Sequence, residues 1–262
     1  MIDIKRAEEE FKRYVSKYDM SQAPISRKFY HTFRVEKICG EIAKRYGMCE
    51  QEIDLAKLIG LLHDIARFEQ HTIYGTYDDI SSIDHGNLAI EILKKDNYIR
   101  KYIKIDKYDD IILKAIKYHN KYSIGTDVSE DEKVFCDIIR DADKLDIFHI
   151  NINESLKLKK DIVEKELITK ETFEQFMAKE LIDRKNVKNN IDRVVVLIAF
   201  IYDFNFNESY KMVKENNYIE RSIDLFKFKE QDTKDKMKII RETAKEYLEE
   251  KINEGEICLK NY

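Results

Sequence analysis

The sequence predicts an all-α protein. It contains a single proline (Pro24) and only seven glycines, so most of the residues that interrupt helices are missing. Charged residues make up 37% of the chain, and apolar residues recur at helical spacing in most segments. A chain of 262 residues can form one large or two small domains. We find no internal repeat or low-complexity linker and expect a single domain.

The charge balance excludes several classes of partner. The chain has 51 acidic and 47 basic residues, which give a net charge of -4, and it has no polybasic segment. Neither duplex nucleic acid nor an anionic membrane is therefore an expected partner. A small anionic substrate remains compatible with local positive charge.

The cysteines and the apolar segments indicate a cytoplasmic protein. Cys39, Cys49, Cys136 and Cys258 are scattered without a CxxC pair, which favours reduced, partly buried thiols over a zinc ribbon or a disulfide framework. The N-terminus has no apolar signal-peptide core. The longest apolar run, residues 194–202, is about half of the roughly 20 residues that span a bilayer.

The first half of the chain is expected to form helices that end in chemically reactive residues. Apolar spacing predicts a helix over residues 4–18, a break at residues 21–24, and a second helix over residues 26–46 capped by Gly47. His31 lies on the apolar face of this second helix. A third helix begins at Glu50 and is apolar around much of its circumference, which places it centrally in the fold.

That third helix delivers His63 and Asp64 near its C-terminal end. Residues 67–83 show no sustained helical stripe and are expected to form an ordered loop, long enough to cover a site. Asp84 is placed to cap the next helix, with His85 in its first turn.

Two more helices complete this half. One spans residues 108–119 and ends at His119, and the other begins near Val134 and carries Asp143. Beyond residue 150 the apolar spacing predicts helices around residues 173–181, 191–204 and 237–248. No histidine follows His149, so we expect this half to support the first.

Four histidines and two aspartates share one setting. Each histidine lies near the end of a separate predicted helix with apolar neighbours three or four positions away: His31, His63, His85 and His119. Asp64 and Asp143 are placed similarly. Any one of these histidines is adequately explained as a core residue bonded to backbone, and Asp84 or His85 as a helix cap. Together they would each need a buried partner, and a shared cation satisfies them all.

The ordered pattern resembles the HD-domain superfamily of metal-dependent phosphohydrolases. A lone histidine is followed by His63-Asp64, two further histidines, and an aspartate before a lysine. The resemblance covers residues 26 to about 150 and implies a helical HD core there, with residues 151–262 as a helical extension packing on it. Residues 63–70 (HDIARFEQ), 74–76 (YGT) and 84–86 (DHG) also look like a bacterial subgroup of that superfamily.

By position, the resemblance implies a set of metal ligands and roles. His31, His63, Asp64 and Asp143 would hold a first divalent cation. His85 and His119 match the extra histidines of members with two metals, in which the aspartate of the pair bridges; with one metal they would contact phosphate or move protons. Asp141 lies about 200° away from Asp143 around the helix and is expected to face elsewhere.

The implied chemistry is hydrolysis by activated water, in which Asp64 acts as a catalytic ligand. One or two divalent cations would polarise a phosphoryl oxygen and lower the pKa of a bound water. Arg67 and Lys144 are the candidates for stabilising the negative charge that develops, with solvated charges or salt bridges to supporting carboxylates as the alternative. The donor set admits Fe, Mn, Zn, Ni, Co or Mg. His71 and His149 lack equivalents in the pattern.

The resemblance therefore implies an enzyme that hydrolyses a phosphoester or phosphoanhydride of a nucleotide or a related small phosphorylated metabolite. The chain has no GxxxxGK[ST] phosphate loop and no GxGxxG after a strand, which argues against nucleotide-powered and dinucleotide redox enzymes. Two alternatives remain open. One is an HD-type oxygenase with a di-iron pair, and the other is a regulator that binds metal or nucleotide without turnover.

Overall fold

The computed structural model describes the backbone of residues 2–260 and the side chains up to residue 255. Within that span the chain is helical and contains no strand, so the all-α prediction is confirmed. The helices gather into two compact units, Met1–Asp143 and Lys144–Tyr262. The expectation of one domain with an extension packed on its core stays a prediction, and each unit is described by itself.

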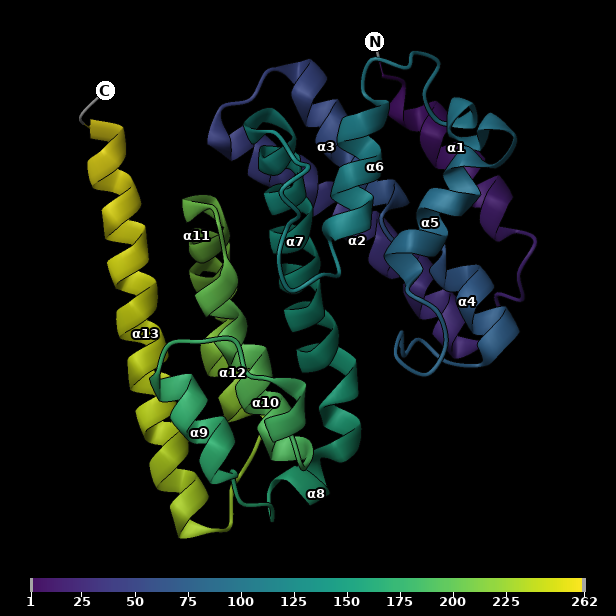
Figure 1. The fold of residues 1–262 in the computed structure, drawn as a ribbon. Coiled ribbons are helices and arrows are strands. Elements are labelled where there is room, and N and C mark those ends of the chain that lie inside the picture. The colour runs from purple at the N-terminus through teal and green to yellow at the C-terminus, as the bar shows by residue number, and fades with distance from the viewer. Residues whose placement is uncertain (1, 261–262) are drawn as a thin grey trace. The chain divides into compact units, whose positions relative to one another are not determined.

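The first unit contains the helices that carry every histidine of the predicted site (Figure 1). They are α1 (Ile4–Val15), α2 (Ala23–Tyr46), α3 (Glu50–Leu62), α4 (Arg67–Tyr74), α5 (His85–Lys94), α6 (Asp109–Tyr118) and the first part of α7 (Glu130–Ile150). Their bounds agree with the predicted helices to within a few residues, with two exceptions at Pro24 and at α4.

Pro24 stands inside the first turn of α2 rather than in the break before it. A proline is tolerated there because the first backbone N–H groups of a helix have no partner within the helix in any case. At the other end Gly47 adopts the left-handed conformation with φ 92° and caps α2, as its spacing predicted.

Helix α4 corrects the expectation that residues 67–83 form a loop throughout. Residues 67–74 are helical, and Gly75, with φ 68°, ends the helix. Helix α4 is short and buries a single large apolar side chain, Phe68, whose ring packs edge-on against Phe11. One buried residue gives no periodic apolar pattern in the sequence, so the helix could not be predicted locally. The tertiary packing of Phe68 stabilises it. Only residues 75–84 remain a loop.

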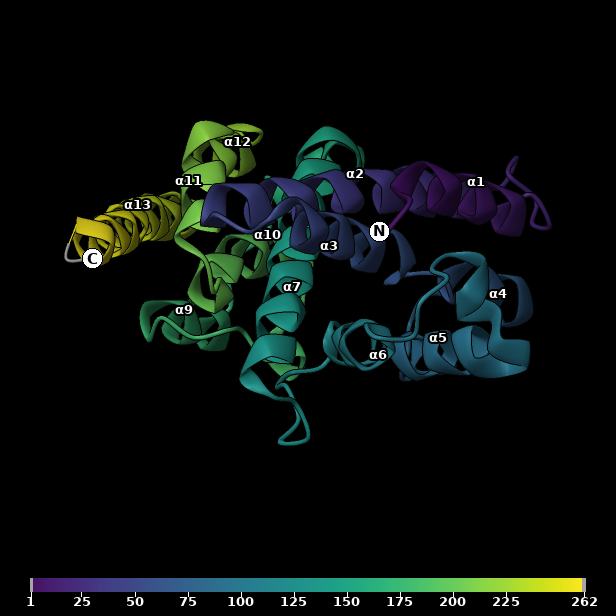
Figure 2. The same cartoon turned by 90° about the horizontal axis from the view of Figure 1, so that it is seen from above.

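Close helix contacts fix the ends of α3 and α5. A Cβ atom at Gly60 would lie 2.8 Å from the Cα atom of Glu36, so α3 approaches the backbone of α2 directly. A Cβ atom at Gly86 would lie 2.8 Å from Oδ1 of Asn120. Figure 2 shows α3 beside α2 and α6 beside α5. The close approach at Gly60 fixes the position of His63 and Asp64 relative to α2. The close approach at Gly86 fixes the position of His85 relative to the end of α6.

The second unit has an aromatic and aliphatic core. It comprises the end of α7 and the helices α8 (Lys160–Val163), α9 (Lys170–Met177), α10 (Asn190–Ala199), α11 (Asn207–Glu215), α12 (Tyr218–Asp224) and α13 (Gln231–Lys260). The long helix α13 runs along α9, α11 and α12 (Figure 1). The rings of Phe148 and Tyr218 stack with centroids 5.3 Å apart.

Among the described helices, none combines the length and the apolar character that a membrane crossing needs. Cys39, Cys49 and Cys136 are free thiols, with Cys49 exposed and the other two buried. The side chain of Cys258 lies outside the described residues.

Candidate metal centre

Helix ends bring the predicted ligands to one place in the first unit. His63 follows the last residue of α3, His85 is the first residue of α5, and His119 follows the last residue of α6. His31 was expected near a helix end, but it lies inside α2, and Asp143 lies inside α7. Neighbouring imidazole rings have centroids 4.8 to 5.3 Å apart along the series His31, His63, His119 and His85.

Asp64 lies at the centre of this cluster and is 2% exposed. Its Oδ2 atom is 3.4 Å from the Nε2 atoms of both His31 and His63. Its Oδ1 atom is 3.4 Å from Nε2 of His85 and 3.8 Å from Nε2 of His119. The two oxygens of one buried carboxylate therefore face two different pairs of imidazoles.

Asp143 joins the first of these pairs. Its Oδ1 atom is 3.1 Å from Nε2 of His31 and 3.9 Å from Nε2 of His63. Burial alone would raise the pKa of the Asp143 carboxyl, but the adjacent His31 and His63 outweigh that effect and hold it below its usual value. Asp143 is therefore an anion facing two imidazole nitrogens.

Three of the imidazoles have their tautomer fixed by a second contact. Nδ1 of His63 lies 2.7 Å from the carbonyl oxygen of Gly60, and Nδ1 of His119 lies 2.6 Å from that of Ile116. Nδ1 of His85 lies 2.6 Å from Oδ2 of Asp79. Since a carbonyl or a carboxylate only accepts hydrogen bonds, each Nδ1 carries the hydrogen and each Nε2 keeps a lone pair in a neutral ring.

Those lone pairs point towards one another and towards Asp64. The Nε2 atoms of His85 and His119 lie 2.9 Å apart, and Nε2 of His63 is buried and makes no hydrogen bond. In a neutral ring whose Nδ1 is protonated, the Nε2 atom carries no hydrogen to donate to the Asp64 oxygens. A cation is the group that satisfies neutral nitrogens and carboxylate oxygens together, and an imidazole held through its other nitrogen is the usual form of a metal ligand.

The pKa shifts favour the same protonation states. Burial lowers the pKa of His63, and burial lowers that of His85 to about 4, although the neighbouring carboxylates act in the opposite direction. Burial would raise the pKa of Asp64, but the Lys28 ammonium, followed by His63, holds it well below its ordinary range. Neutral imidazoles and ionised carboxylates are the forms that bind a divalent cation.

Six residues therefore fit one cation or two. They form the groups His31, His63 and Asp64, and Asp64, His85 and His119, with Asp143 beside the first group. All six were expected from the sequence, and the structure brings them together. His71 instead packs its ring against Tyr77, and His149 lies 3.2 Å from Nδ2 of Asn153.

Arg67 lies near Asp64, but it donates hydrogen bonds to the loop that follows α4. Its Nη1 atom donates to the carbonyl oxygen of Tyr77 at 2.6 Å and to Oδ1 of Asp79 at 2.8 Å. Its Nε atom is 3.4 Å from Oδ1 of Asp64. Arg67 therefore ties the loop to the carboxylate at the centre, and direct contact with a substrate stays a prediction.

Lys144 has its partner in the second unit. Its ammonium lies 2.6 Å from Oδ2 of Asp203 and donates to the carbonyl oxygen of the same residue. The expected contact between Lys144 and a substrate stays a prediction.

Three residues near the centre were not identified from the sequence. Lys28 donates to Oδ2 of Asp64 at 2.6 Å, and Asp79 contacts both His85 and Arg67. Asn120 donates to Oδ2 of Asp79 at 3.0 Å. The spacing of Lys28, three residues before His31 on the same helix, was a usable signal, whereas the loop residue Asp79 has no periodic neighbours to reveal it.

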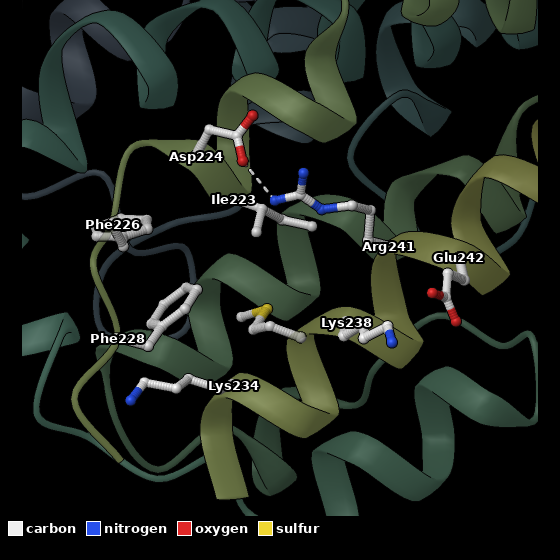
Figure 3. Close-up of a pocket in the computed structure, with 9 residues that line it drawn as sticks. Ile223, Asp224, Phe226, Phe228, Lys234, Lys238, Arg241 and Glu242 are labelled. Carbon is white, nitrogen blue, oxygen red and sulfur yellow. Dashed lines mark hydrogen bonds and ion pairs between the residues drawn. The ribbon is translucent and has the colours of Figure 1, made fainter. Parts of the chain in front are cut away.

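A separate hollow of about 420 Å³ lies in the second unit between α12, α13 and the segment that joins them (Figure 3). Asp224 and Arg241 form an ion pair there at 2.5 Å, and the rings of Phe226 and Phe228 have centroids 5.7 Å apart. Its lining contains no histidine and no cysteine. The hollow therefore lacks the donor set of the metal centre.

Residues 29–151 match the family model described as HD domain. This range includes all six residues of the metal centre. No curated protein and no solved structure matches the chain.

Proposed function

We propose that the chain, which belongs to the HD-domain superfamily through residues 29–151, is a metal-dependent phosphohydrolase. Members of this superfamily are mostly hydrolases, and the cluster of histidines and aspartates in this chain is able to hold a metal. The expected substrate is a phosphoester or phosphoanhydride of a nucleotide or a related small phosphorylated metabolite.

The observation that carries the proposal is the pair of environments around Asp64. Its two oxygens face His31 and His63 on one side and His85 and His119 on the other. Asp64 would thus be shared by both groups of candidate ligands, with Asp143 beside the first group. When bound, divalent cations supply Lewis-acid chemistry, polarising a phosphoryl oxygen and easing the ionisation of the attacking water.

The residues of the chain fix the geometry of that site. Gly60, Ile116 and Asp79 accept the Nδ1–H groups of His63, His119 and His85, so each ring presents its Nε2 atom at a set angle. Arg67 holds Asp79 and the carbonyl oxygen of Tyr77. Ligands on helix ends that are locked by such contacts keep their positions while a substrate enters and leaves.

The test is elemental analysis of the purified protein together with a panel of phosphomonoesters, phosphodiesters and nucleoside phosphates. We expect a bound divalent metal, phosphate release from at least one class, and loss of that release when a chelator strips the metal. A metal-loaded protein that releases no phosphate across the panel would contradict the proposal and favour a binding protein. Bound iron with oxygen consumption and no phosphate release would favour the oxygenase.

A further inference from the structure

Lys28 contacts the central carboxylate from the same helix as His31. It lies three residues before His31 in α2, so the two side chains share one face of the helix. Its ammonium is 2.6 Å from Oδ2 of Asp64, and the side chain is 22% exposed. Lys28 is therefore a cation beside the candidate metal centre that keeps access to solvent.

The oxygen that Lys28 contacts is also an oxygen that faces the first group of ligands. Oδ2 of Asp64 is 3.4 Å from Nε2 of both His31 and His63. A divalent cation bound by these atoms neutralises that oxygen and repels an ammonium group at 2.6 Å. A lysine has a flexible four-carbon stem, so its ammonium can turn to a nearby anion without movement of α2.

The ring of Tyr77 lies beside Lys28 and Arg67. The ammonium of Lys28 lies 5.8 Å and the guanidinium carbon of Arg67 5.7 Å from the centroid of the Tyr77 ring. The Tyr77 hydroxyl is buried and makes no hydrogen bond. Burial and then the Asp64 charge raise its pKa, so it remains a phenol that can donate. A buried donor without a partner is costly unless a ligand accepts from it.

Arg67 differs from these two residues because its Nη1 atom is already occupied. It donates to Gln70, to Asp79 and to the carbonyl oxygen of Tyr77. These contacts make Arg67 a positioning residue for the segment that carries Tyr77. The Tyr77 hydroxyl has no partner and the Lys28 ammonium is partly exposed, so both are able to donate to a substrate oxygen.

We propose that Lys28 and Tyr77 form a phosphoryl-binding pair. The Lys28 ammonium neutralises Asp64 in the metal-free protein, and it turns to a phosphoryl oxygen of the substrate once a cation takes over Asp64. The Tyr77 hydroxyl donates a hydrogen bond to the same phosphoryl group. This inference rests on the proposed function, since it names the residues of that site that bind the anionic substrate.

The test measures metal binding and anion binding separately on the full chain. The variants are Lys28→Met, Tyr77→Phe, which removes only the hydroxyl, and Lys44→Met as the control, an exposed lysine in the last turn of the same helix. Isothermal titration calorimetry gives the Kd of Mn²⁺, and then the Kd of inorganic phosphate for the Mn²⁺-loaded protein. Circular dichroism shows that each variant is folded.

We expect Lys28→Met to bind Mn²⁺ at least as tightly as the wild type, because it removes a competing cation, and to bind phosphate about tenfold or more weakly. Tyr77→Phe should keep its Mn²⁺ affinity and lose about three- to tenfold in phosphate affinity. The control should change neither.

Two results would overturn the pair without touching the proposed function. One is an unchanged phosphate affinity in Lys28→Met. The other is a loss of Mn²⁺ affinity in the same variant, which would show that Lys28 positions Asp64 for the metal and does not bind phosphate. A wild-type chain that binds neither Mn²⁺ nor phosphate would overturn the proposed function itself.

Discussion

Asp64 in the first unit and Asp192 in the second are both buried carboxylates, and their surroundings differ in kind. Asp192 is 0% exposed and accepts from the backbone N–H groups of Thr169 and Lys188, both at 2.9 Å, and from the Thr169 hydroxyl. Asp64 faces four imidazole nitrogens, at least three of which present lone pairs, and one flexible lysine.

This difference separates a structural acid from a candidate metal ligand. The donors around Asp192 belong to the backbone and to a short side chain, so the folded chain satisfies this carboxylate by itself. The imidazoles around Asp64 cannot satisfy it in their neutral form, so in the metal-free chain the Lys28 ammonium balances its charge. Burial alone therefore does not identify a site; the kind of atom that faces the buried group does.

The largest effect is expected from Asp64→Ala. Because both groups of ligands share this carboxylate, the variant should lose bound metal and reduce phosphate release by roughly 10³-fold or more. Metal content by elemental analysis and turnover on the best substrate of the panel measure the two effects. Full metal occupancy together with full turnover would show that Asp64 is not the centre of the site.

Asp192→Ala is the opposite case. Three donors lose their acceptor inside the second unit, so we expect the free energy of unfolding to fall by about 2–4 kcal/mol. Metal content per folded molecule should stay as in the wild type. Urea denaturation gives the first quantity and elemental analysis the second. A loss of metal from a folded Asp192→Ala protein would end the distinction between the two acids.

Asp79→Asn tests whether the surroundings of the ligands matter as much as the ligands. Asp79 accepts from Nδ1 of His85 and is paired with Arg67. The amide should weaken metal binding by about 10–100-fold, because it no longer fixes the orientation and basicity of His85. Calorimetry with Mn²⁺ measures this, and Asp183→Asn, at an exposed helix cap of the second unit, is the control. Equal metal affinities in the two variants would remove Asp79 from the site.

Glu36 is a buried acid that holds a proton, unlike Asp64. The smallest of the expected effects is its contribution to the pH dependence of the free energy of unfolding. Burial and then the neighbouring Glu8 raise its pKa to about 8. The folded chain thus holds a proton that the unfolded chain releases near its ordinary pKa, so this contribution to stability is present at low pH and is lost as the pH rises towards 8. Over pH 6.5–8.5 the metal-free protein should lose at least about 1 kcal/mol.

The matched variant is Glu36→Gln, which cannot titrate and should flatten that part of the stability profile. Urea denaturation in the presence of a chelator at several pH values compares the two proteins. Identical slopes would show that Glu36 does not hold its proton in the folded chain.

Local pattern accounts for most of the fold in the first unit and for the identity of its candidate metal ligands. The apolar spacing of α2 and α3 and the capping positions of Gly47 and Asp84 are local properties, and the structure has them as predicted. His63, His85 and His119 were recognisable at helix ends, whereas His31 and Asp143, which lie inside α2 and α7, were recognisable by their apolar neighbours. The family pattern then ordered them.

Tertiary structure alone decided the features that depend on residues distant in the sequence. Helix α4 forms because Phe68 packs against Phe11, a contact with no trace in the local spacing. Asp79 reaches His85 from a loop, and the Tyr77 ring meets Lys28 across 49 positions of the chain. The sequence by itself determined which side chains could bind a metal, because that is a property of residue type and helical period. Which oxygen faces which nitrogen, and which donor is left without a partner, depended on how the helices pack.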